Sequence, residues 1–67
     1  MNDWEYVNFS QDHELNYHLT KVDKRQTEAN RTTLRAMGSE LKSALNVTNV
    51  THTQFHDYIS RNLSRLD

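Results

Sequence analysis

The chain has 67 residues, of which 34% are hydrophobic and 25% charged, and its net charge is −1. A single domain of this length buries only about 60% of the surface that its unfolded chain exposes, so the core is thin. The absence of cysteine excludes both a disulfide framework and a thiolate metal site as supports for that core, which leaves association as the remaining support.

Charge is unevenly distributed along the chain. Residues 1–19 contain four acidic and no basic side chains, whereas residues 20–42 contain six basic and three acidic ones. Opposite ends of two copies, or of one folded-back chain, are therefore expected to attract. No window approaches 18 consecutive apolar residues and the first five residues are acidic where a signal peptide is basic, so we expect a cytoplasmic protein.

Residues 1–9 are predicted to form an extended arm on an otherwise all-α domain. The chain has no proline and one glycine, which favours long helices over a sheet with many turns. Large and polar residues alternate from Trp4 to Phe9, as in a short strand. Since one strand alone is unstable, the arm must lie against the helices through Trp4, Tyr6 or Phe9, or pair with another copy.

Residues 10–45 are predicted to form one long amphipathic helix. Ser10 is the expected N-cap, and Asp12 places a negative charge in the first turn. Gly38 followed by Ser39 is typical of a helix end and a fresh start, so the helix either runs on unbroken, kinks there, or stops near Met37 and restarts. The apolar face is interrupted by Gln26, Asn30 and Thr33. These polar side chains must be exposed, pair across a helix–helix interface or contact a partner, because burying an unpaired amide costs about 1–3 kcal/mol.

Residues 46–51 are predicted to be a connector, and residues 52–66 a second helix that folds back as a helical hairpin. Thr51 and Gln54 have the spacing of a capping box, which begins this helix at His52. The expected hairpin core combines residues from both helices: Leu34, Met37, Leu41, Leu45, Phe55, Ile59 and Leu63.

The hairpin would leave Leu15, Leu19 and Val22 uncovered within one copy. Exposed apolar stripes of this kind usually mark an interface, so we predict a homodimer in which the first halves of two long helices pack together. Gln26 and Trp4 complete the predicted self-association surface. A different protein partner on the same stripe is the second possibility, and a monomer whose arm covers the stripe is the third.

Nothing in the sequence indicates catalysis, a metal or a cofactor. The chain has no cysteine, no Gly-rich loop and no G-x-S-x-G turn. His52 and His56 are four residues apart, but two ligands do not make a metal site and Asp57 points away from them. We therefore expect neither an enzyme nor a metalloprotein.

Two functions remain. The leading hypothesis is a small non-catalytic protein–protein interaction module acting as a homodimer, such as a regulator, an adaptor or a small phage- or plasmid-type inhibitor. The alternative is a helix-turn-helix protein that binds DNA through residues 39–60, since this segment has the helix, turn, helix rhythm of that motif. Its expected contacts are Lys42, His52, Thr53, Gln54, Arg31 and Arg35.

Overall fold

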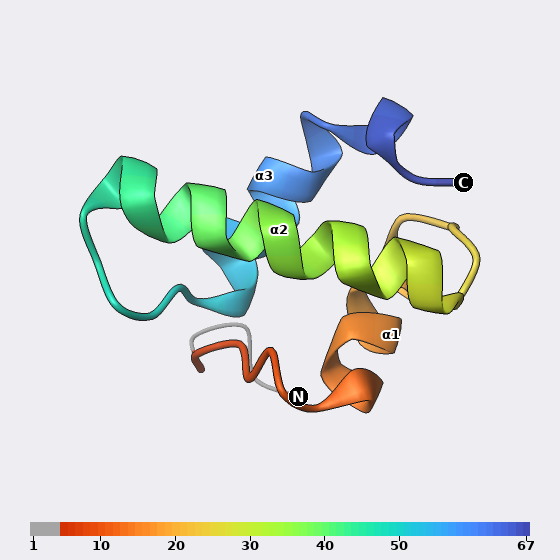
Figure 1. Ribbon diagram of the computed structural model, residues 1–67, viewed down its shortest axis with the longest axis horizontal. Coiled ribbons are helices and arrows are strands. Elements are labelled where there is room, and N and C mark those ends of the chain that lie inside the picture. Colours follow the sequence, from red (N-terminus) through yellow and green to blue (C-terminus); the bar gives the residue numbers. More distant parts are fainter. Residues whose placement is uncertain (1–4) are drawn as a thin grey trace.

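The computed structural model describes residues 5–67, and this part of the chain is all-helical, as predicted. Three α-helices are followed by a single 3-10 turn at Leu63–Arg65. They are α1 (Asp12–Lys21), α2 (Glu28–Leu45) and α3 (His52–Ser60). Figure 1 shows α2 crossing the molecule, and both α1 and α3 pack against it.

The predicted long helix is two helices, and the break does not lie at Gly38. Residues 22–27 separate α1 from α2, and Gly38 lies inside α2. Asp23 adopts the left-handed conformation with φ 58°, which reverses the chain after α1. Thr27 then caps α2 by accepting a hydrogen bond from the backbone N–H of Asn30 at 3.2 Å. The predicted helix is thus divided into α1 and α2, which pack against each other.

The start of α3 and the end of α2 lie where the sequence signals predict, whereas the end of α3 and the N-cap of α1 do not. Thr51 and Gln54 form the predicted capping box, and α3 begins at His52. It ends at Ser60, six residues earlier than predicted. The N-cap of α1 is Gln11, which makes no side-chain capping bond, and not Ser10 as predicted.

One continuous core joins all three helices, the arm and the C-terminal tail. The buried apolar residues are Val7, Leu15, Leu19, Leu34, Met37, Leu41, Val50, Phe55, Ile59 and Leu66. Of the predicted hairpin core, Leu45 and Leu63 are instead 45% and 36% exposed. The core therefore uses α1, the arm and Leu66 of the tail in place of the C-terminal end of α2 and the 3-10 turn.

The arm lies against the start of α3. Tyr6 and Thr51 form an isolated antiparallel bridge, in which the N–H of Val7 donates to the carbonyl of Val50 at 2.9 Å and the N–H of His52 donates to the carbonyl of Glu5 at 3.0 Å. Val7 is buried, while Tyr6 points outward and is 63% exposed. The side chain that covers the helices from this bridge is thus Val7, which the sequence pattern did not single out.

The polar residues that interrupt the apolar face are satisfied within one copy. Asn30 is buried; its Nδ2 donates to the carbonyl of Arg25 at 2.7 Å, and its Oδ1 accepts from the N–H of Asp67 at 3.0 Å. Gln26 lies in the loop and donates to Oγ1 of Thr20, and Thr33 donates to the carbonyl of Ala29. Asn30 therefore fastens the C-terminal tail to the start of α2, and no second molecule is needed to pair it.

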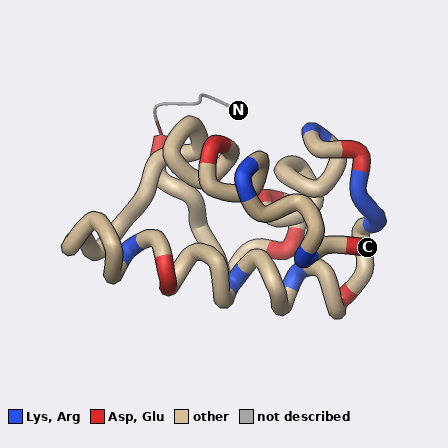
Figure 2. Tube along the Cα trace, turned by 90° about the horizontal axis from the view of Figure 1, so that it is seen from above, with Lys and Arg blue, Asp and Glu red and all other residues tan. Residues whose placement is uncertain are grey.

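The segregated charges attract within the chain. Arg35 donates to Oδ1 of Asp12 at 2.8 Å, and Arg31 lies 3.9 Å from the same carboxylate. Both arginines also contact Glu28. Figure 2 shows basic and acidic positions interspersed along α2 and its surroundings. The acidic start of α1 is thus held against the basic face of α2.

Candidate functional site

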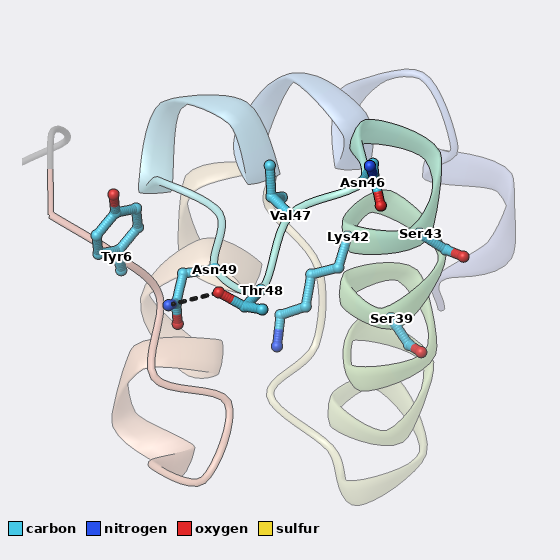
Figure 3. A pocket seen from close by; sticks show the side chains of 8 residues that line it. All are labelled: Tyr6, Ser39, Lys42, Ser43, Asn46, Val47, Thr48 and Asn49. Carbon is cyan, nitrogen blue, oxygen red and sulfur yellow. Dashed lines mark hydrogen bonds between the residues drawn. The ribbon is translucent and has the colours of Figure 1, made fainter.

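A groove lies where the arm, the C-terminal end of α2 and the connector meet. Figure 3 shows Tyr6 on the arm, the α2 residues along one wall and the connector between them. The groove has a volume of about 710 Å³. Its lining residues are Tyr6, Ser39, Lys42, Ser43, Asn46, Val47, Thr48 and Asn49.

The largest exposed apolar side chains gather at this end of the molecule. Tyr6 is 63% exposed, Leu45 45% and Val47 42%. Tyr6 and Val47 line the groove itself, and Leu45 lies two residues before Val47 at the end of α2. The surface therefore offers isolated apolar side chains surrounded by hydroxyl and amide groups.

Two local features build the groove. Asn46 ends α2 in the left-handed conformation, with φ 56°, and its N–H donates to the carbonyl of Ser43, so the chain turns sharply into the connector. On the arm side, the Phe9 ring packs directly over Gly38, where a Cβ atom would overlap it. The amine of Lys42 lies 4.6 Å from the centre of the same ring. Gly38 thus admits the arm to the surface of α2, which explains its place in the middle of a helix.

The predicted self-association surface is largely internal. Leu15 and Leu19 are completely buried within a single copy, and Val22 is partly buried against the same core. The expectation that these residues form an uncovered stripe is therefore wrong. The reason is the break at residues 22–27, which folds α1 back so that α2, α3 and the arm together cover it. Gln26 is bonded to Thr20, and Trp4 lies outside the described residues.

The predicted nucleic-acid contacts do not form one free surface. His52 is 1% exposed, with its ring turned into the core. Arg31 and Arg35 are engaged with Asp12 and Glu28, so much of their charge is neutralised. Of the remaining predicted contacts, Thr53 and Gln54 are exposed on the first turn of α3, but Gln54 is bonded back to Thr51 in the capping box. Lys42 faces Phe9 in the groove.

A buried polar cluster, which sequence reasoning missed, joins α1 to α3. Nε2 of His18 lies 2.8 Å from Nδ1 of His52, and the two rings are stacked with an interplanar angle of 11°. Nε2 of His52 lies 3.2 Å from Oε1 of Glu14, at ion-pair distance but without the alignment of a hydrogen bond. The sequence feature that could have predicted this cluster is the position of His18, three residues after Leu15, on the apolar face of the first helix.

The clustered histidines are not arranged as a metal site. The His52 ring turns towards His18, so the four-residue spacing of His52 and His56 does not place their two rings around one metal position. Within residues 5–67, no group of three or more His, Asp or Glu side chains is placed to hold a metal ion.

A second polar network fixes the C-terminal segment to α2. Arg65 donates to both carboxylate oxygens of Glu40, at 2.8 and 2.9 Å, and the hydroxyl of Tyr58 donates to Oε1 at 2.9 Å. The bonds from Arg65 first, and from Tyr58 second, lower the pKa of Glu40 from 4.5 to about 2. The carboxylate in turn raises the pKa of the Tyr58 hydroxyl. This exposed network fastens the tail and carries no unpaired charge towards the groove.

Comparison with protein-family models, with curated proteins and with solved structures gave no match to this chain. Along residues 5–67, no helix combines the length and the apolar character needed to cross a bilayer. The functional argument therefore depends on the geometry of this molecule.

Proposed function

We propose that this protein is a small non-catalytic protein–protein interaction module that docks a protein partner on the groove between the arm, α2 and the connector. The observation that carries the proposal is the exposure of Tyr6, Leu45 and Val47 at one end of a molecule whose remaining large apolar side chains are, within residues 5–67, mostly buried. Tyrosine is favoured in such interfaces because it offers a large rigid surface and a polar hydroxyl.

The lining supports docking better than catalysis. Among the described residues, those that line the groove include hydroxyl, amide and amine groups but no carboxylate and no imidazole. Ser39 and Ser43 therefore have no imidazole or carboxylate in the groove lining to act as a general base. A partner segment with one apolar side chain for Tyr6 and Val47, and polar groups for the surrounding amides and hydroxyls, fits this chemistry.

The DNA-binding alternative has less support. A recognition helix contacts bases through its first turn, yet His52 is buried there and its ring bonds to His18. Arg31 and Arg35 would have to leave their ion pairs with Asp12 and Glu28 to reach phosphates. We therefore prefer the protein-docking function.

The test compares capture of a partner by the wild-type chain and by matched surface variants. Crosslinking and affinity capture from the native cells should recover a specific protein with the wild type. Val47→Asp should reduce its recovery at least tenfold, since a charge is placed in the groove. Leu63→Asp is the control, because Leu63 is also exposed but does not line the groove. Equal recovery with Val47→Asp, or equal loss with Leu63→Asp, would refute the proposed surface.

The same variants test whether a second copy of the chain binds in the groove, as the predicted homodimer would require. With Leu15 and Leu19 buried, sedimentation of the pure protein should give the monomer mass of 8.0 kDa. A mass twice as large that returns to 8.0 kDa in Val47→Asp would identify a second copy as the occupant of the groove.

A further inference from the structure

The buried histidines His18 and His52 are joined by one hydrogen bond between their ring nitrogens, which links two helices. Their facing nitrogens are 2.8 Å apart, and the two side chains are 0% and 1% exposed. At this distance one nitrogen must donate and the other must accept. A buried polar pair is stable only while this hydrogen bond is intact, since each imidazole would otherwise lose it without gaining water.

The surroundings of the pair allow one positive charge but not two. The carboxylate of Glu14 is 3.2 Å from the outer nitrogen of His52 and can stabilise a single imidazolium. Protonation of both rings would place N–H against N–H at the facing nitrogens. It would also leave two cations in the core beside the Glu14 carboxylate, an arrangement that burial makes costly.

The His18–His52 pair is connected to the hydrogen bonds that hold the arm against the helices. Oε1 of Glu14, which faces His52, also accepts a hydrogen bond from the N–H of Asn8 at 3.1 Å. The backbone N–H of His52 donates to the carbonyl of Glu5 at 3.0 Å. One anchor of the arm is thus on α1 and the other on α3, so a separation of the two helices moves both.

We propose that the His18–His52 pair is an acid-sensitive switch: protonation of both rings separates α1 from α3 and releases residues 5–8 from the helices. Free histidine takes up its proton near pH 6.5, so the released state binds a proton that the closed state excludes as the pH falls below this value. The stability of the closed form relative to the released form is therefore highest above about pH 6.5 and falls progressively below it.

The other titratable and charged groups around the pair, within residues 5–67, do not change the number of positive charges that the pair can hold. On α1, the Tyr17 ring packs edge-on against both imidazoles, and Lys21 lies over the same tyrosine ring. On the arm, Glu5 contributes its backbone carbonyl. On α2, Arg35 is paired with Asp12 and Lys42 lies over Phe9. On α3, His56 follows one turn after His52. Glu14 is thus the carboxylate that contacts the pair directly.

Amide hydrogen exchange of the full-length protein tests the switch. The reporters are the amides of Val7 and His52, whose bonds to Val50 and Glu5 hold the arm. After correction for the intrinsic exchange rate, their protection should fall about tenfold per pH unit below about pH 6.5, as one excluded proton requires. Constant protection between pH 7.5 and 5.5 would overturn the proposal.

Two variants separate the switch from general acid sensitivity. His18→Phe keeps an aromatic ring but removes the shared proton, so protection of the Val7 amide should no longer depend on pH in this range. His13→Gln changes an exposed histidine and should behave as the wild type. The same pH dependence in His18→Phe as in the wild type would refute the assignment.

A measurement on the unaltered protein covers the case in which His18→Phe does not fold. Nitrogen-15 NMR of the imidazoles should show one proton shared between His18 and His52 at pH 7.5. It should also show that both rings are protonated together only when the Val7 amide protection is lost. Two independent titrations near pH 6.5 with the arm still in place would contradict the switch.

Discussion

Replacement of Leu19 by Ala distinguishes a buried core residue from an interface residue. Leu19 is completely buried in a single copy, on the helix that the sequence pattern assigned to dimerisation. Truncation of a fully buried leucine costs about 2–5 kcal/mol, from the lost transfer free energy and the cavity that remains. A domain of this length is stable by only about 3–10 kcal/mol in total, at the usual stability per residue. The substitution should therefore remove a large part of the stability.

The assay is thermal and urea unfolding, followed by circular dichroism at protein concentrations that differ a hundredfold. Leu19→Ala should lower the midpoint by about 10 °C or more, since 1 kcal/mol corresponds to about 4–8 °C in domains of this size. The midpoints of both proteins should not depend on concentration, because the core is completed within one chain. Leu45→Ala is the matched control; as Leu45 is 45% exposed in α2, its effect should stay within about 0.5 kcal/mol.

Two results would refute this reasoning. If the wild-type midpoint rose with concentration, folding would be coupled to self-association, and Leu19 would be covered by a second copy in solution. If Leu19→Ala changed stability by no more than Leu45→Ala, the side chain would not be part of a packed core at all.

Three further predictions concern pH and the packing of the arm and tail. Below about pH 6.5 the free energy of unfolding of the wild type should fall by about 1.4 kcal/mol per pH unit, as expected for one excluded proton. Urea titrations of His18→Phe should show no such pH dependence. Gly38→Ala should destabilise by about 1 kcal/mol or more despite the better helix propensity of alanine, because its Cβ overlaps the Phe9 ring; a gain in urea stability would contradict this. Because Arg65 lowers the pKa of Glu40 to about 2, the stabilisation from the ionised carboxylate is present above about pH 4.5 and is lost as the pH falls towards 2. The difference in melting temperature between the wild type and Glu40→Gln should therefore shrink between about pH 4.5 and about 2. A constant difference would contradict this role of Glu40.

The local signals in the sequence predicted individual helices well. The capping box of Thr51 and Gln54, the start of α3 at His52 and the connector at residues 46–51 need only neighbouring residues to form, and all are present. The Gly38–Ser39 pair was the exception, since it resembles a helix break but lies inside α2. Its glycine is required by the Phe9 ring, a contact from a residue 29 positions earlier that no local pattern reveals.

The sequence by itself determined that this chain is helical, where its last helix begins and which faces are apolar, because periodicity and capping act over a few residues. Only the tertiary structure decided what covers those faces. The turn at Asp23 folds α1 back onto α2, so Leu15 and Leu19 enter the core of one copy and His18 meets His52 across 34 residues of sequence. Burial and charge pairing depend on these distant contacts, and a helical pattern specifies which side must be covered without specifying by what.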